Sequence, residues 1–210
     1  FRSFVDEKLG TFNLKLNESQ YVVTDNENKM IAAFRDECSR IGCSDHYLNK
    51  QLQHAFESEQ IHVNRNTVEK VNCDIVQYTF KQVKSVVTNV RTSHRQQQLS
   101  IKLQAYSKTR FNGAFIMLEI FRQVFDELPS VISNNKTTNE SFNVIDKQLL
   151  DEICEFLKPF EEVIEALSEE DRPSLHRVIP LRECLLKKCA VNDEDSAGLC
   201  ELKIFLGEKT

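Results

Sequence analysis

Asp25 lies between a run of β-favouring residues, Tyr21 to Val23, and a helical pattern, where a carboxylate can do chemistry. Open α/β sheets place ligands at the carboxyl ends of their strands, and Mg²⁺ prefers oxygen ligands there. A two-metal site needs several such carboxylates. Taken alone, Asp25 or Asn26 is better explained as the cap of the following helix, so both interpretations stay open at this point.

Cys43 and His46 have C-x-x-H spacing at a predicted corner between a strand and a helix. Two such ligands do not complete a structural zinc site, which needs four, and the sequence contains no C-x-x-C pair. On these residues alone, the favoured interpretation is a buried Cys beside a His that hydrogen-bonds across the turn.

The segment Lys108–Asn112, with the sequence KTRFN, places cations beside an aromatic ring in a break between two helical patterns. Phe111 in such a break can stack on an unpaired base while Lys108 and Arg110 hold phosphates. A core Phe at the start of a helix explains the residue equally well.

Residues 75–118 contain no acidic side chain, although the whole chain has a net charge of −5. Their basic residues are Lys81, Lys84, Arg91, Arg95, Lys102, Lys108 and Arg110. On a helix, the first four fall within about 80° of one another, on the side away from a valine-rich stripe. Such cations can follow a phosphodiester backbone, or they can form a solvated face paired with the acidic C-terminal region.

Residues 1–62 predict the elements that position Asp25 and the C-x-x-H motif. The expected order is helix, strand, helix, strand, helix, in the ranges 1–16, 19–25, 29–39, 40–44 and 46–58. Asp45 is the expected N-cap of the last helix. This order indicates part of a layered α/β unit.

Residues 66–210 predict helices only. The expected ranges are 67–98, 114–128, 144–167, 174–189 and 197–206. Pro129 is expected to end the second helix, Pro159 to kink or divide the third, and 133–143 to form a polar loop. The predicted fold class is therefore α/β plus α, dominated by helices.

The composition excludes several classes of protein. No apolar run approaches the roughly 18 residues that span a bilayer, so we expect no membrane partner. The seven cysteines are odd in number and scattered, which favours a reducing compartment, cytosol or nucleus, over a disulfide framework. The first residue is not Met, so we interpret the chain as a piece of a longer protein.

Four motifs in order resemble those of the hAT superfamily of DNA transposases, the Hermes-like family. The motifs are TDN at 24–26, CSDHYLN at 43–49, TRFN at 109–112 and LLDEICEFLKPFEEVIEALS at 149–168. The resemblance extends from Tyr21 to about Ile179.

The resemblance implies a partial RNase H-like core at 1–62 followed by a mainly helical insertion domain at 66–210. In that family three acidic residues hold two Mg²⁺ or Mn²⁺ ions for phosphoryl transfer at DNA ends. Asp25 matches the second of them, as a catalytic residue and metal ligand. Cys43, His46 and Asn49 match a motif beside the active site, with His46 in a catalytic role and the other two in structural roles.

The resemblance also implies partners and a location: transposon-end and hairpin DNA, self-association, and the nucleus. The expected DNA contacts are Lys81, Lys84, Arg91, Arg95, Lys108, Arg110 and Phe111. The family has Trp where this chain has Phe111, and the chain contains no Trp. Three hypotheses stay open: a fragment of an active transposase that does not cleave DNA by itself, a non-catalytic domesticated nuclear protein that binds DNA or dimerises, and a helical scaffold without nucleic acid.

Overall fold

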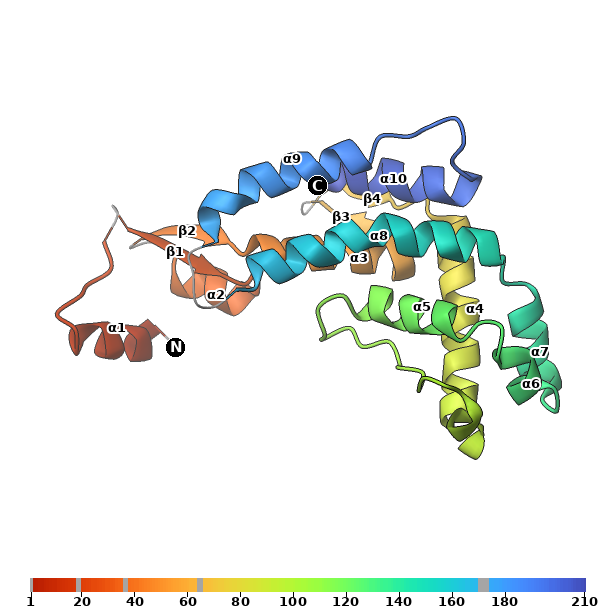
Figure 1. Cartoon of the computed structure of the whole chain (residues 1–210). Helices are drawn as coiled ribbons and strands as arrows, with labels where there is room; N and C mark the ends of the chain where they lie inside the picture. The colour runs from red at the N-terminus through yellow and green to blue at the C-terminus, as the bar shows by residue number, and fades with distance from the viewer. Residues whose placement is uncertain (1, 18–19, 36–37, 64–65, 170–173) are drawn as a thin grey trace. The chain divides into compact units, whose positions relative to one another are not determined.

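A computed structural model describes residues 2–17, 20–35, 38–63, 66–169 and 174–210. Helices dominate these residues and two small sheets accompany them, which confirms the helix-dominated fold class (Figure 1). The chain divides into two compact units, residues 1–48 and 49–210, and helix α3 contains the boundary between them.

The first unit contains a two-stranded parallel sheet. Strand β1 (Tyr21–Thr24) pairs with β2 (Ser39–Gly42), in a register that places Tyr21 opposite Ser39. Parallel strands need a crossover, and α2 (Asn28–Ala33) lies within it. The predicted order of elements in this unit is therefore confirmed.

Helix lengths in the first unit differ from those predicted. Helix α1 (Arg2–Gly10) ends well before residue 16, because Asn13 takes the left-handed conformation, with φ of 56°. Helix α3 (Ser44–Glu57) begins one residue before Asp45, so Asp45 is a buried side chain of the first turn and not the N-cap.

The second unit begins with a hairpin that the sequence analysis missed. Strands β3 (Gln60–His62) and β4 (Val68–Lys70) are antiparallel. Helix α4 (Asp74–Arg91) follows them, so the prediction of one helix over 67–98 was wrong at both ends. The left-handed backbone of Asn72, with φ of 51°, separates β4 from α4.

The remaining helices of the second unit follow the 3₁₀ turn η1 (His94–Gln98). They are α5 (Gly113–Gln123), α6 (Leu128–Ile132), α7 (Lys136–Asn143), α8 (Lys147–Leu167) and, after the 3₁₀ turn η2 (Leu175–Arg177), α9 (Val178–Lys188) and α10 (Ala197–Lys209). Helix α5 packs along α8, and α4 contacts both α7 and α10 (Figure 1).

Three predictions about this region were wrong or are now decided. The predicted polar loop at 133–143 contains α7, because the side chain of Asn135 accepts a hydrogen bond from the Thr138 amide and caps the helix. Pro129 ends no helix; it lies in the first turn of α6, where its missing N–H costs nothing. Helix α8 continues through Pro159 without dividing.

The core of the second unit explains why α4 has a fixed orientation. The buried residues of α4 include Val83, Val86, Val87 and Val90, which are at helical spacing, so the opposite face of the helix points to solvent.

None of the helices described here combines the length and the apolar character that a bilayer crossing requires.

Candidate nucleic-acid interface

Asp25 directly follows β1, as predicted, and its surroundings are organised by Arg40 of β2. The Arg40 guanidinium donates to Thr24 Oγ1 (2.9 Å), to the main-chain carbonyl of Asp25 (2.6 Å) and to Asn26 Oδ1 (2.8 Å). Asp25 Oδ1 accepts a hydrogen bond from the Glu27 amide at 3.3 Å. Glu27 is itself the N-cap residue of α2, so neither Asp25 nor Asn26 is the cap.

The described residues give Asp25 no cluster of further ligands for a metal. Among them, no three His, Cys, Asp or Glu side chains gather in a way that could hold a metal ion. A single carboxylate is not a donor set for Mg²⁺ or Mn²⁺, so Asp25 needs further acidic ligands before it could hold either ion.

Cys43 and His46 lie where the sequence analysis predicted, at the junction of β2 and α3. The Cys43 amide donates to the Thr24 carbonyl at 2.7 Å, which extends the parallel ladder by one bond, and its thiol is half-buried. The His46 side chain is exposed on the first turn of α3.

The predicted basic stripe divides between two elements. Lys81, Lys84 and Arg91 are on α4, but α4 ends at Arg91, so Arg95 belongs to η1 and not to the helix. The Arg95 guanidinium donates to the Val131 carbonyl at 3.4 Å. The prediction of a single continuous stripe of four cations along one helix is therefore wrong.

Glu57, at the end of α3, brings together two of the predicted contact residues. Lys84 Nζ lies 2.7 Å from Glu57 Oε1, and Lys108 Nζ lies 2.8 Å from Oε2. The Glu57 side chain is only 17% exposed, whereas the Lys108 side chain is 68% exposed. Burial acts to raise the pKa of Glu57, but hydrogen bonds and charge from the two ammonium groups outweigh it and lower that pKa below its ordinary value.

Tyr106 completes this cluster. Lys84 Nζ lies 4.9 Å from the centre of the Tyr106 ring, within the range of a cation–π contact. Burial, and then the neighbouring Glu57 carboxylate, raise the pKa of the Tyr106 hydroxyl. The ring of Phe80 on α4 contacts Tyr106 edge to face, with centroids 5.2 Å apart. These contacts join α3, α4 and the link between η1 and α5.

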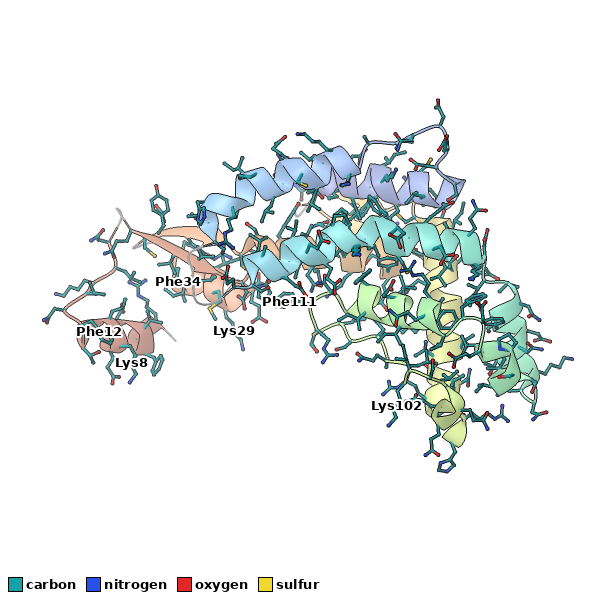
Figure 2. All side chains as sticks on the ribbon, viewed as in Figure 1. Lys8, Phe12, Lys29, Phe34, Lys102 and Phe111 are labelled. Atoms are coloured by element: carbon teal, nitrogen blue, oxygen red, sulfur yellow. The ribbon has the colours of Figure 1, made fainter. Side chains whose placement is uncertain are left out.

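That link, residues 99–112, has no helix or strand and carries three of the predicted DNA contacts, Lys108, Arg110 and Phe111, together with the basic residue Lys102. Lys102 and Phe111, labelled in Figure 2, lie near its two ends. Gln53 Nε2 donates to the Lys108 carbonyl at 2.8 Å, and the Asn112 amide donates to Asn49 Oδ1 at 3.3 Å. The motif residues Asn49 and Asn112 are thus in contact, a meeting that the sequence alone did not show.

The backbone at the end of the link explains part of the RFNG sequence. Asn112 is left-handed, with φ of 55°, and the Gly113 amide donates to the Arg110 carbonyl at 3.2 Å. A Cβ atom at Gly113 would overlap the carbonyl oxygen of Ser107. Asn tolerates the left-handed conformation, and Gly allows the close approach of the two backbone segments.

Three cations keep their charge available to a ligand. The side chains of Lys81, Arg91 and Lys102 are exposed and, within the residues that the structure describes, make no hydrogen bond or ion pair. Arg110 is also exposed, and its guanidinium donates to Gln104 Oε1 at 3.2 Å. The acid-free segment therefore presents its positive charge from α4 and from the link.

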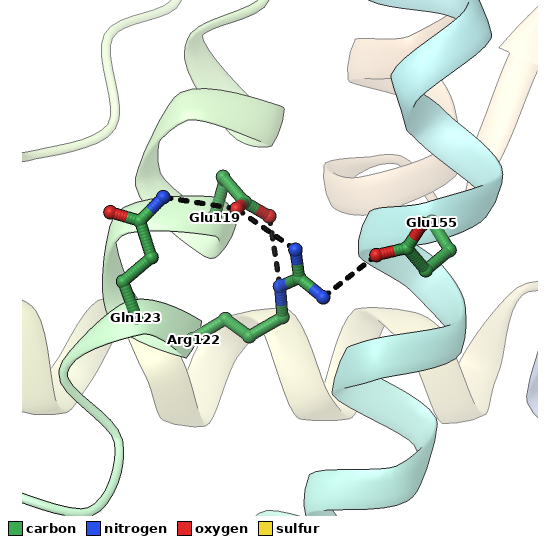
Figure 3. Close-up of polar contacts among 4 residues, drawn as sticks. All are labelled: Glu119, Arg122, Gln123 and Glu155. Atoms are coloured by element: carbon green, nitrogen blue, oxygen red, sulfur yellow. Dashed lines mark hydrogen bonds and ion pairs between the residues drawn. The ribbon is translucent and has the colours of Figure 1, made fainter.

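A second polar cluster, which the sequence analysis missed, ties α5 to α8 (Figure 3). Arg122 donates to both oxygens of Glu119, at 2.9 Å each, and to Glu155 Oε1 at 2.8 Å. Gln123 Nε2 donates to Glu119 Oε1 at 3.0 Å. Burial acts to raise the pKa of Glu119, but the Arg122 and Gln123 bonds lower it overall. Helical spacing of Glu119 and Arg122 was the available signal for this pair.

No protein-family model matches the chain, and no curated protein matches it either.

Proposed function

We propose that the chain is a DNA-binding part of a hAT-type transposase or of a non-catalytic descendant of one. The observation that carries the proposal is the acid-free segment 75–118, whose exposed cations Lys81, Arg91 and Lys102 have no partner among the described residues. Each cation that neutralises a phosphate releases a condensed counterion, and this release drives binding to duplex DNA.

The four ordered motifs and the first unit support the transposase ancestry. The parallel pair β1–β2 with α2 in the crossover, and Asp25 directly after β1, fit part of an RNase H-like core. In the proposed parent, Asp25 would supply one carboxylate of a Mg²⁺ or Mn²⁺ site, and acidic residues elsewhere would supply the others. DNA ends as substrate, self-association and a nuclear location belong to the same proposal.

The experiment measures the affinity of the 210-residue chain for a fluorescently labelled DNA hairpin at several salt concentrations. The variant replaces Lys81, Arg91 and Lys102 together by Gln. We expect weaker binding and a salt dependence, log K against log[salt], that becomes shallower by about 0.9 for each phosphate that the variant no longer neutralises.

The matched control replaces three exposed lysines of α8 and α9, Lys158, Lys187 and Lys188, by Gln. Both variants change the net charge equally, so a difference between them reports position and not total charge. Weak binding of the unmodified chain, without salt dependence, would overturn the proposal in favour of a helical scaffold.

A further inference from the structure

Three polar side chains of α3 form a stripe that follows the end of the link. Asn49, Gln53 and Glu57 are spaced four residues apart, so they lie on one face of the helix. We call these three residues the polar stripe. Each of them bonds to the segment 106–112.

The three contacts differ in what they hold. Asn49 accepts from the main-chain amide of Asn112, and Gln53 donates to the main-chain carbonyl of Lys108. Glu57 binds the side-chain ammonium group of Lys108. Two main-chain contacts and one side-chain contact together fix the path of the backbone and the direction of Lys108.

A link without helix or strand needs such contacts to keep one conformation. Ordering a backbone segment costs conformational entropy, and binding is weakened when this cost is met only in the complex. The close approach of Ser107 and Gly113 and the left-handed Asn112 restrict the same segment from its other end.

We infer that Asn49, Gln53 and Glu57 are positioning residues that hold segment 106–112 so that Lys108 and Arg110 meet neighbouring phosphates of a DNA backbone. A lysine ammonium has three donors, and Glu57 engages Lys108 through its carboxylate while the lysine stays 68% exposed. The lysine therefore keeps donors for a phosphate. This inference rests on the proposed function and deepens it.

The test uses Gln53→Ala and, separately, Asn49→Ala in the 210-residue chain. Neither substitution changes the net charge, so long-range attraction to DNA stays as it was. With the labelled DNA hairpin as probe, we expect each variant to bind about fivefold more weakly, the factor that corresponds to about 1 kcal/mol. The salt dependence should become shallower by about 0.9 to 1.8, the value for one or two phosphates, because Lys108 and Arg110 are no longer presented.

A second measurement, amide hydrogen exchange without DNA, should show faster exchange over 106–112 and unchanged protection of α4 and α8. Gln123→Ala is the matched control: it removes a 3.0 Å hydrogen bond from a glutamine of α5 that does not touch this segment. We expect it to leave both the affinity and the salt dependence unchanged.

The outcomes separate the two proposals. One outcome is faster exchange over 106–112 with unchanged DNA affinity and unchanged salt dependence. It would show that the polar stripe has a structural role only, and it overturns the inference while the proposed function stands. Weaker binding without faster exchange, or equally weakened binding in the Gln123→Ala control, overturns it as well. Failure of the unmodified chain to bind the hairpin overturns the proposed function and the inference together.

Discussion

Lys84 and Lys108 share the two oxygens of one carboxylate, that of Glu57, at 2.7 and 2.8 Å. Lys84 is on α4 and Lys108 is on the link between η1 and α5. The carboxylate of Glu57, on α3, therefore binds both parts of the acid-free segment. The cations of that segment are therefore not equivalent. Lys84 and Lys108 are already paired within the protein, whereas Lys81, Arg91 and Lys102, which have no partner among the described residues, offer their full charge to a ligand.

Glu57→Gln should lower the free energy of unfolding at neutral pH by about 1 kcal/mol, because the substitution removes two ion pairs of a mostly buried carboxylate. The pKa of Glu57 is lower in the folded chain than in the unfolded one. Its stabilisation is therefore complete above the unfolded value of 4.5 and is lost as the pH falls through the lower folded pKa.

Urea unfolding of both proteins at neutral and at acid pH measures this effect. The difference in unfolding free energy should shrink in acid, where Glu57 of the natural chain also becomes neutral. A difference that stays constant with pH would show that the glutamate acts through shape and not through charge.

Arg122→Met should destabilise the contact between α5 and α8 by about 1–2 kcal/mol, since Glu119 would stay largely covered without its cation. The pKa of Glu119 is lowered in the folded chain, so this destabilisation too should be largest above 4.5 and diminish in acid. Chemical denaturation across this pH range measures it.

Glu155→Gln provides the comparison for Arg122→Met. The Glu155 side chain is 65% exposed, so its ion pair with Arg122 is screened by water and its removal should cost much less. Equal destabilisation by the two variants would contradict the importance that we assign to the pair of Arg122 and Glu119.

Gly113→Ala should destabilise residues 49–210 by about 2 kcal/mol, because the added methyl group would overlap the Ser107 carbonyl and force two backbone segments apart. Gly10→Ala is the control, since nothing lies within 4 Å of a Cβ atom there. Urea unfolding followed by far-UV circular dichroism compares the two. A neutral Gly113→Ala variant would show that the end of the link adjusts freely.

Pro159→Ala should raise the free energy of unfolding by about 1 kcal/mol or more, because it restores a main-chain donor inside a continuous helix. Thermal and urea unfolding of the variant and the natural chain give the sign. A destabilised variant would instead show that the packing of α5 on α8 depends on a bend at this proline.

Local patterns predicted the helices of this chain well where they were long and amphipathic. The spacing of the valines correctly predicted which face of α4 is buried. Helices α8 and α10 lie close to their predicted ranges. The hairpin β3–β4 was missed because each strand has only three residues, too few for a periodic pattern to show. Helix α7 was missed because its sequence is mostly polar and resembles a loop, so Asn135 was not recognised as its N-cap.

The candidate site was predictable in its cations and in the motif residues Asn49 and Phe111, but not in most of the contacts that join them. Charge counting found Lys84 and Lys108 without showing that they meet, since their common partner is 27 residues before Lys84 in sequence. The residues of the polar stripe are spaced four apart, and this spacing can be recognised in the sequence. The segment that they contact is an irregular link, and no sequence periodicity predicts its path. Arg40 beside Asp25 was missed for the same reason: the contact depends on the register of two strands.

The parallel pair β1–β2 has a practical consequence for work at high concentration. Within the described residues each strand has one neighbour only, and Tyr21 and Val23 are 70% and 53% exposed. Open edges with exposed aromatic and β-branched side chains are templates for strand addition between molecules, and natural sheets block this with charge on the edge. A lysine at Val23 would therefore be the first substitution to choose for a chain that must stay dispersed for spectroscopy.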